Sequence, residues 1–156
     1  MPTCYMLIGV PGSGKSTWIA KQSFDWGHTV IASTDNYVER VATERGKTYS
    51  QVFDEVMPDA VRHMANVVRE AIAEEYDIIW DQTSTTRWTR KKKFAMLPES
   101  YEVVAVVFPN PSKEELARRL GNRPGKTIPP EVVQSMIDKY EEPTESEGFT
   151  KIIHVR

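Results

Sequence analysis

A glycine-rich stretch near the N-terminus carries the residue types best suited to holding phosphate groups. Residues 9–17 read Gly-Val-Pro-Gly-Ser-Gly-Lys-Ser-Thr and fit the pattern G-x-x-x-x-G-K-[ST], directly after a short apolar run. Glycines let the chain wrap closely around a polyphosphate, with backbone N–H groups and the positive end of a following helix directed at it. The residues that we predict to bind the phosphates of ATP are Gly9, Pro11, Gly12, Ser13, Gly14, Lys15, Ser16 and Thr17. Among these, Lys15 should reach the β- and γ-phosphates, and the Ser16 hydroxyl should ligate Mg²⁺.

Two aspartates follow apolar runs that have the composition of buried strands. Asp35 comes after residues 29–33, and Asp81 ends the run 77–81. Asp35 is predicted to face a crevice and take the proton of an attacking hydroxyl, or to cap the helix that follows; the two roles are compatible. Asp81 is predicted to hold Mg²⁺ through water or to bind the acceptor, and a plain turn residue is the alternative. Thr83 either assists Asp81 or begins the turn.

A stretch rich in glycine, proline and basic residues, from position 122 to 130, is predicted to be an exposed loop. In small kinases, arginines on such a lid close over the phosphates and stabilise charge in the transition state. We therefore predict that Arg119 and Arg123 contact the phosphates of ATP. The alternative is an ordinary solvated helix end, where cations also interact well with the helix dipole. Lys126 is predicted to be solvated.

The densest cationic stretch is residues 87–93, Arg-Trp-Thr-Arg-Lys-Lys-Lys. It begins six residues beyond Asp81, so it can border the acceptor side of a crevice. Such a patch suits a phosphodiester backbone, with an aromatic ring available for base stacking. We therefore predict that Arg87 and Trp88 bind the substrate, and a solvated helix face is the alternative.

The elements that must position these residues alternate between strands and helices. Strands are predicted over residues 5–8, 29–33, 77–81, 101–108 and 151–155. Helices are predicted over residues 15–22, 37–45, 49–75, 88–97, 112–120 and 131–140, with Pro58 as a kink or as the start of a second helix. This alternation predicts a single α/β domain over residues 1–156, with three layers, a mainly parallel sheet of about five strands and helices on both faces. A small lid is expected at about residues 119–130. Ligands of such sheets bind beyond the carboxyl ends of the strands, so the polar residues there should converge.

The composition is that of an ordinary soluble globular protein, with 40% hydrophobic and 27% charged residues. A net charge of −2 means that any surface for nucleic acid must be a local patch. The single cysteine, Cys4, excludes an internal disulfide, fits a reducing compartment and is predicted to be a small buried residue. We find neither a signal peptide nor an apolar run of about 18 residues, so a cytoplasmic protein with no membrane partner is expected. The three histidines show no metal-ligand spacing.

Taken together, these motifs resemble the kinase domain of polynucleotide 5′-hydroxyl kinases, both the phage enzymes and the kinase half of the animal DNA-repair enzyme. Residues 8–18 look like the phosphate loop of that family, and 119–123 resemble its lid, which implies that Arg123 binds the ATP phosphates. Thr-Asp-Asn-Tyr at 34–37 stands where the family has its general base, which implies that Asp35 activates the acceptor hydroxyl. The resemblance covers nearly the whole chain and extends to residues 140–149, before the last strand.

Two positions depart from the family pattern. Asp-Gln-Thr-Ser at 81–84 resembles the family's Asp-x-Thr-Asn, but Ser84 replaces the asparagine. Phage enzymes carry an arginine three residues after the catalytic aspartate, for the substrate phosphate, and here that position is Val38. Arg40 and the patch at 87–93 are the candidates for that contact in this sequence.

The resemblance implies an ATP- and Mg²⁺-dependent kinase with Lys15, Asp35 and Arg123 as catalytic residues. The expected acceptor is the 5′-hydroxyl of DNA or RNA, as a single strand or an end, and the expected location is the cytoplasm, that of the host if a phage encodes the chain. A hydroxymethylated base in phage DNA or a small-molecule hydroxyl is the alternative acceptor. A non-catalytic nucleotide-binding module is the remaining alternative, and the oligomeric state is open.

Overall fold

The computed structural model describes residues 1–122, 125, 126 and 128–156. Five strands form one sheet in the order β2-β3-β1-β4-β5, and every neighbouring pair runs parallel. The strands are β1 (Thr3–Ile8), β2 (Thr29–Ala32), β3 (Asp77–Trp80), β4 (Glu102–Val107) and β5 (Lys151–His154). The central strands are almost continuously apolar, as expected for a parallel sheet with both faces covered. The predicted α/β fold is therefore confirmed.

Helices connect the strands and begin where the sequence provides a cap. Ser33, Thr48, Thr86 and Ser112 each precede a helix, and each side-chain oxygen accepts a hydrogen bond from the backbone N–H three residues later. The helices are α1 (Lys15–Lys21), α2 (Thr34–Arg45), α3 (Tyr49–Glu74), α4 (Arg87–Phe94), α5 (Lys113–Gly121), α6 (Pro130–Asp138) and the short 3₁₀-helix η1 (Glu145–Glu147). Within the described ranges, none of these helices combines the length and the apolarity needed to cross a membrane.

The start of α2 differs from the prediction in a way that matters for the site. The helix begins at Thr34 and not at residue 37, so Asp35 lies in its first turn. Ser33 is the N-cap, and the alternative in which Asp35 caps the helix is therefore wrong. Pro58 lies inside α3, which continues through it as one helix.

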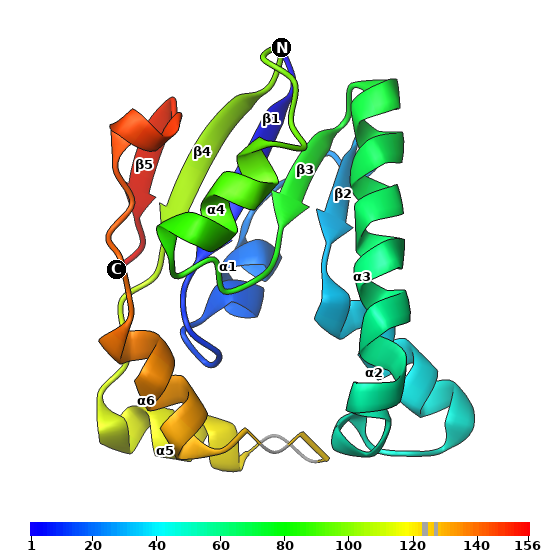
Figure 1. The fold of residues 1–156 in the computed structure, drawn as a ribbon, viewed down its shortest axis with the longest axis vertical. Coiled ribbons are helices and arrows are strands. Elements are labelled where there is room, and N and C mark those ends of the chain that lie inside the picture. Colours follow the sequence, from blue (N-terminus) through cyan, green and yellow to red (C-terminus); the bar gives the residue numbers. More distant parts are fainter. Residues whose placement is uncertain (123–124, 127) are drawn as a thin grey trace.

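Alternate residues of the central strands point to opposite faces of the sheet. Cys4 and Met6 of β1 pack with Val68 of α3 on the face that α3 and α4 cover, and Cys4 is fully buried, as predicted. Leu7 of β1 packs with Ile19 of α1 on the other face. Figure 1 shows this arrangement, with α3 and α4 in front of the sheet and α1 behind it.

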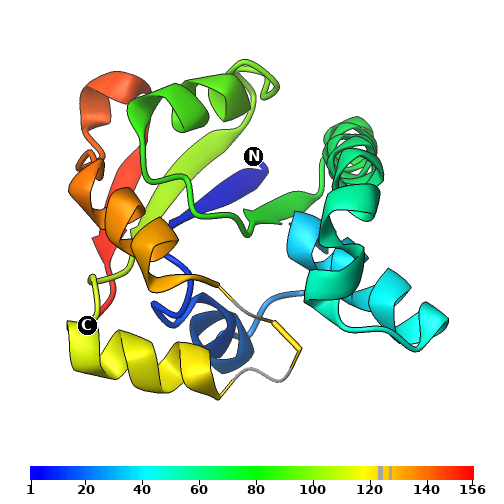
Figure 2. The same ribbon diagram turned by 60° about the horizontal axis from the view of Figure 1, so that its bottom comes forward.

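The carboxyl ends of the strands all point to the end of the molecule where α5 and α6 lie (Figure 1). Turning this end forward shows α5 and α6 on one side, α2 and the start of α3 on the other, and α1 between them (Figure 2). The helices α5 and α6 pack onto the loop after β1, where Val10 contacts Leu116 and Val133 in a buried cluster. The fold therefore gathers the loops after β1, β2 and β3 at one edge, as the sequence predicts.

Candidate active site

The glycine-rich loop joins β1 to α1, as its motif requires. Gly12 and Gly14 have positive φ angles of 81° and 104°, which non-glycine residues adopt only with strain. The N–H of Gly9 donates a hydrogen bond to the carbonyl of Thr83 at 3.0 Å, which ties the loop to the segment after β3. We call residues 9–16 the P-loop from here on.

Gly9 is required for a different reason, which is space. A Cβ atom at this position would lie 2.4 Å from Ser13 Oγ, which is closer than real contacts allow, and a tight 3.0 Å from Phe108 Cβ. The Ser13 hydroxyl is buried and has no hydrogen-bond partner among the described residues. Ser13 therefore packs its side chain under the P-loop, and it can contribute to phosphate binding through its backbone.

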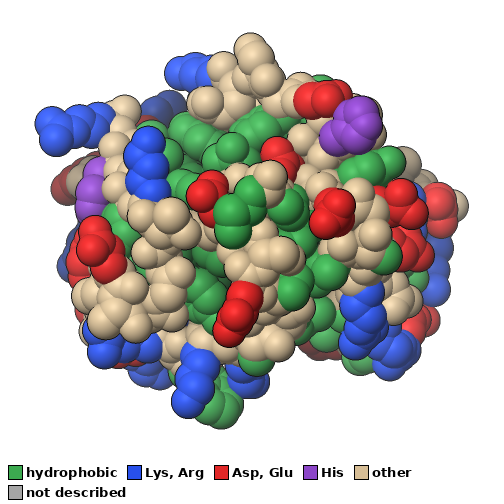
Figure 3. Space-filling model, turned by 90° about the horizontal axis from the view of Figure 1, so that it is seen from above, with side chains coloured by type: hydrophobic (Ala, Val, Ile, Leu, Met, Phe, Trp, Pro, Cys, Tyr) green, Lys and Arg blue, Asp and Glu red, His purple; other side chains and the backbone are tan. Residues whose placement is uncertain are grey.

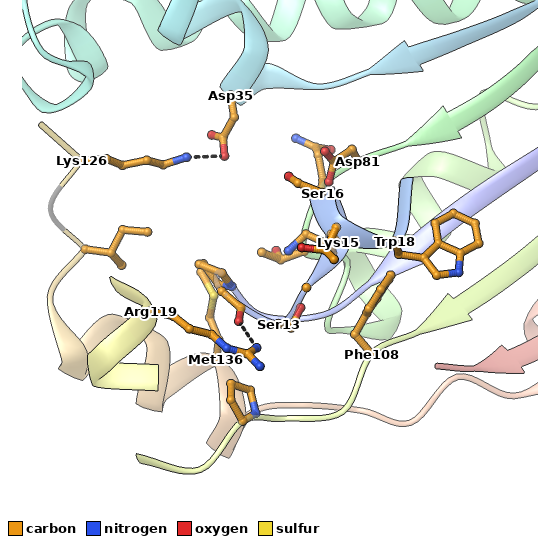
Figure 4. A pocket seen from close by; sticks show the side chains of 18 of the residues that line it. Ser13, Lys15, Ser16, Trp18, Asp35, Asp81, Phe108, Arg119, Lys126 and Met136 are labelled. Carbon is orange, nitrogen blue, oxygen red and sulfur yellow. Dashed lines mark hydrogen bonds and ion pairs between the residues drawn. The ribbon is translucent and has the colours of Figure 1, made fainter. Parts of the chain in front are cut away.

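Lys15 and Ser16 lie at the start of α1, on the side of the loop that faces the cleft. The ammonium of Lys15 donates to the carbonyls of Gly9 and Val10 at 2.9 and 3.1 Å, so it lies along the P-loop. Ser16 is exposed, and both Ser16 and Asp81 line the cleft, in the part of it that Figure 4 shows. Hydroxyl and carboxylate oxygens are ligands that suit Mg²⁺, so the residues present fit the predicted magnesium position.

One continuous cleft of about 1470 Å³ surrounds the P-loop. This exceeds the 300–1,000 Å³ or so of a typical small-ligand pocket and leaves room for two molecules side by side. The nucleotide half is lined by the P-loop and by Trp18, Phe108, Pro109, Pro111 and Arg119. The acceptor half is lined by residues from α2, α3, the end of β3 and the segment before α6; they include Asp35, Glu39, Tyr49, Phe53, Asp54, Asp81 and Lys126.

The aromatic wall of the nucleotide half was not predicted from the sequence. Phe108 directly follows β4, and its ring meets the indole of Trp18 edge to face, with centroids 6.2 Å apart. Figure 4 shows both side chains beside the P-loop. Their position suits the adenine ring of a nucleotide whose phosphates lie in the loop. An aromatic residue at the carboxyl end of a strand next to the phosphate-binding strand is the signal that could have identified it.

Asp35 accepts hydrogen bonds from two side chains of the acceptor half. The Tyr49 hydroxyl donates to its Oδ1 atom at 2.6 Å, and the Lys126 ammonium donates to Oδ2 at 3.0 Å. Burial alone would raise the pKa of Asp35, but the Tyr49 hydrogen bond and the charge of Lys126 outweigh burial and hold the pKa below its ordinary value. Asp35 is therefore an ionised carboxylate that faces the cleft.

Asp81 has the opposite electrostatic character. Burial raises its pKa above the ordinary value; Lys15 opposes this effect and the neighbouring charge of Asp35 adds to it. Thr83, two residues further on, also lines the cleft. The predicted residues Asp35, Asp81 and Thr83 are thus brought together with Lys15 at one site.

Lys126 contradicts the prediction that it is solvated. It is only 8% exposed, and its ammonium lies 3.0 Å from Asp35, 3.5 Å from Glu39 and 4.4 Å from the centre of the Tyr49 ring. A desolvated ammonium requires such partners, which is why the lysine turns inward and not toward water. Lys126 is thus a further residue of the site that sequence reasoning missed, together with its partners Tyr49 and Glu39.

Arg119 lies over the P-loop, where the lid prediction placed it. Its guanidinium donates to the Gly12 carbonyl at 2.6 Å and to Glu115 at 2.7 Å (Figure 4). Glu115 also accepts from Arg118, so its carboxylate orients both arginines. Arg123, the other predicted lid arginine, lies outside the described residues.

Arg87 and Trp88 do not line the cleft. The guanidinium of Arg87 donates to the Thr144 hydroxyl at 3.0 Å, and Trp88 is 64% exposed with the Lys92 ammonium over its ring. In the same helix, Arg90 is fully buried and forms an ion pair with Glu147. The cationic stretch 87–93 is therefore partly a structural element of α4, and the structure does not bring it to Asp35.

The position that carries arginine in phage kinases is part of the protein core. Val38 is fully buried between α2 and α3, in a cluster with Ala42 and Val52. Arg40, the other candidate for a phosphate contact, lies with its guanidinium 5.0 Å from the Tyr37 ring centre and is not among the residues that line the cleft. Within the described part of the chain, the acceptor half thus has Lys126 as its own cation, and two carboxylates already bind it.

Comparison with known proteins supports the fold and the phosphate loop. A family model described as an AAA domain matches residues 5–143. A chain of an RNA repair complex superposes with a TM-score of 0.65 at 20% identity, over 88% of this chain and 43% of that one. A fungal RNA kinase superposes with a TM-score of 0.59 at 14% identity, over 100% of this chain and 76% of the kinase. A gluconokinase from Sinorhizobium meliloti superposes with a TM-score of 0.54 at 21% identity, over 99% of this chain and 82% of the gluconokinase.

These structures share a fold and differ in what they act on, according to their names. At such low identity the likeness concerns the fold alone, and this chain spans less than half of the chain from the RNA repair complex. The family model, in contrast, covers most of the chain, including the P-loop, both aspartates and the lid. The chain therefore belongs to this AAA-domain family and has the P-loop kinase fold.

Proposed function

We propose that this chain is an ATP-dependent phosphotransferase that moves the γ-phosphate of ATP onto an acceptor hydroxyl held at Asp35. The observation that carries the proposal is one cleft that joins the P-loop to an ionised carboxylate, with room for two ligands. A non-catalytic nucleotide-binding module needs neither the second half of the cleft nor a carboxylate oriented by two donors.

The chemistry follows from the positions of a few side chains. The P-loop amides and Lys15 would hold the β- and γ-phosphates, and Ser16 would bind Mg²⁺, which neutralises phosphate charge when bound. The acceptor oxygen forms a bond to phosphorus, the bond from phosphorus to the β–γ bridging oxygen breaks, and ADP leaves. The hydroxyl proton passes to Asp35. Arg119 would add positive charge from the lid side. In the kinases that the chain resembles, an arginine at the position of Arg123 does the same.

The first candidate acceptor is the 5′-hydroxyl end of DNA or RNA. Its support is the resemblance of the P-loop and Asp35 motifs to polynucleotide kinases, and the likeness in fold to an RNA kinase. If a strand does bind, its terminal nucleoside alone would enter the acceptor half, because Arg87 and Trp88 lie outside the cleft.

The lining of the acceptor half favours a second candidate, a small hydroxyl compound without phosphates. Among the described residues, four carboxylates line this half, those of Asp35, Glu39, Asp54 and Asp81, against the ammonium of Lys126. Phe53 adds an exposed apolar surface there. Anionic walls repel a phosphodiester and accept a neutral or cationic molecule. At the opposite end of the molecule, basic and acidic side chains are interspersed, with no basic track for a strand (Figure 3).

A matched series of acceptors separates the two candidates. Transfer of labelled γ-phosphate from ATP would be measured to thymidine, to thymidine 3′-monophosphate and to an oligothymidylate with a free 5′-hydroxyl. These share a base and a hydroxyl and differ in phosphate charge. A 5′-end kinase should prefer the oligonucleotide, lose that preference steeply as salt rises, and ignore a 5′-phosphorylated control. A small-molecule kinase should show the reverse order, and polyols and DNA with a hydroxymethylated base extend the series.

The variant Asp35→Asn tests the reaction itself. It keeps the shape of the side chain and removes its ability to accept a proton, so transfer should fall by at least about 100-fold while ATP affinity changes little. Turnover would be measured with the best acceptor, and ATP binding by calorimetry. Equal turnover in both proteins would remove Asp35 as the base. Absence of transfer to every acceptor by the wild-type protein would instead favour the binding module.

A further inference from the structure

Gly125 and Lys126, which lie between α5 and α6, contact the opposite wall of the cleft. The backbone N–H of Ser50, in the first turn of α3, donates to the Gly125 carbonyl at 3.1 Å. Gly125 has a φ of 72°, and a Cβ atom there would lie 2.9 Å from Thr48 Cβ. A side chain at residue 125 would therefore be both strained and blocked. The chain is built to approach the α2–α3 corner closely at this point.

This docking places Lys126 in the acceptor half. Its ammonium donates to Asp35 and to Glu39, and it lies over the ring of Tyr49, so three side chains surround it. Asp35 and Glu39 are four residues apart on α2 and lie on one face of that helix. A buried lysine held by two carboxylates and an aromatic face has a defined position, unlike a solvated lysine.

The same contacts fix the orientation of Asp35. Tyr49 holds one carboxylate oxygen from α3, and Lys126 holds the other from the lid side, as Figure 4 shows for the lysine. Each carboxylate oxygen can accept a second hydrogen bond. Oδ2 can therefore bind an acceptor hydroxyl while Lys126 stays in place. Two donors from different elements leave the carboxylate little freedom to rotate.

We infer that Lys126 is a positioning residue of the acceptor site: from its place between α5 and α6, it holds the carboxylate of Asp35 in one orientation. This inference rests on the proposed role of Asp35 as the base. It follows that a residue of the lid helps to orient the catalytic base. Arg119 of α5 contacts the P-loop, and Lys126, between α5 and α6, contacts Asp35. Residues of this one part of the chain therefore reach both halves of the cleft.

Removal of the lysine charge should change how Asp35 titrates. Among the described residues, the groups near Asp35 are Tyr49 on α3, Lys126, Lys15 of the P-loop, Asp81 after β3, and Glu39, which shares Lys126 with it. Burial raises the pKa of Asp35, and Tyr49, Lys126 and Lys15 lower it. Without Lys126, fewer groups oppose the effect of burial, so the pKa of Asp35 should rise.

The test is a titration of the Asp35 carboxyl carbon by NMR in the whole chain, which needs no acceptor. We expect the pKa of Asp35 to be higher in Lys126→Met than in the wild type, and to be restored at least in part in Lys126→Arg. Lys139→Met, an exposed lysine after α6 that does not line the cleft, is the matched control and should titrate as the wild type does. The Ser50 amide signal reports in each variant whether Ser50 still contacts Gly125.

Kinetics with the best acceptor provide the second measurement. In Lys126→Met, kcat/KM should fall by about 10- to 100-fold, with its acid limb at higher pH, while ATP affinity is retained. An unchanged Asp35 titration in Lys126→Met would overturn the inference, as would an unchanged pH profile. The proposed function fails differently: Asp35→Asn keeps full turnover, or the wild-type protein transfers phosphate to no acceptor.

Discussion

Replacement of Arg90 by methionine should destabilise the whole domain, although Arg90 belongs to the most basic stretch of the sequence. The side chain is fully buried and donates to Glu147 at 2.8 and 3.3 Å and to the Ser84 carbonyl at 3.0 Å. Methionine keeps much of the aliphatic stem, so the variant mainly removes these three hydrogen bonds. Breaking a buried ion pair from one side costs about 3–5 kcal/mol. We expect about 3 kcal/mol, because Glu147 keeps 12% exposure and a hydrogen bond from the Thr144 N–H.

Urea denaturation followed by circular dichroism measures this effect. With a typical slope of about 2 kcal/mol per molar, the unfolding midpoint should fall by about 1.5 M. Lys91→Met is the matched control, on the exposed side of the same helix, and should change stability by less than about 0.5 kcal/mol. In a double-mutant cycle, adding Glu147→Gln to Arg90→Met should cost much less than Glu147→Gln alone.

The effect also has a defined pH dependence. Burial raises the pKa of Glu147, but the hydrogen bonds from Arg90 and the Thr144 N–H, together with the charges of Arg90 and Arg87, outweigh burial and hold the pKa below the ordinary value. Such a group contributes stability above its unfolded-state pKa, and that contribution is lost as pH falls through the lower folded-state pKa. The difference between wild type and Arg90→Met should therefore be full near neutral pH and shrink in acid. A loss below about 1 kcal/mol at pH 7, with additive single effects, would refute a structural role for Arg90.

Two further changes test the P-loop and the core position at residue 38. Gly9→Ala should displace Ser13 and weaken ATP binding by about tenfold or more, measured by calorimetry, whereas Gly121→Ala, which meets no atom within 4 Å, should leave it unchanged. Val38→Arg should lower stability by at least about 3 kcal/mol in urea denaturation and should not improve transfer to an oligonucleotide, because this fully buried position faces α3 and not the cleft. Normal stability with improved transfer would contradict the buried placement.

Local patterns were enough to predict the fold and the phosphate loop. Short apolar runs that alternate with helical segments fix the order of elements, and parallel strands then gather their following loops at one edge. Lys15, Asp35 and Asp81 each lie within a few residues of a strand end, so their meeting follows from topology alone. The motif at residues 9–16 needs no long-range information, because its glycines define the loop locally.

The features that the sequence did not predict depend on contacts between distant residues. Lys126 meets Asp35 across 91 positions, and nothing local distinguishes it from a solvated lysine. Arg90 pairs with Glu147 across 57 positions. A weak signal existed there, because Phe94 lies four residues after Arg90 and should share its helix face. Charge density along the chain indicated a ligand surface, whereas the position of each side chain around the helix decides which charges are buried.

The two carboxylates of the cleft illustrate how the surroundings divide their roles. Burial raises the pKa of both, and Tyr49 and Lys126 reverse this effect at Asp35, whereas Asp81 keeps a raised pKa. A lowered pKa makes Asp35 a weaker base, which at first argues against a catalytic role. Phosphoryl transfer, however, passes through a loose transition state in which alignment and charge matter more than basicity. A carboxylate that is ionised throughout the physiological range and fixed by two donors meets that requirement. Under the proposed function, Asp81, which lines the same cleft as Ser16, is left to bind the acceptor or a metal-bound water.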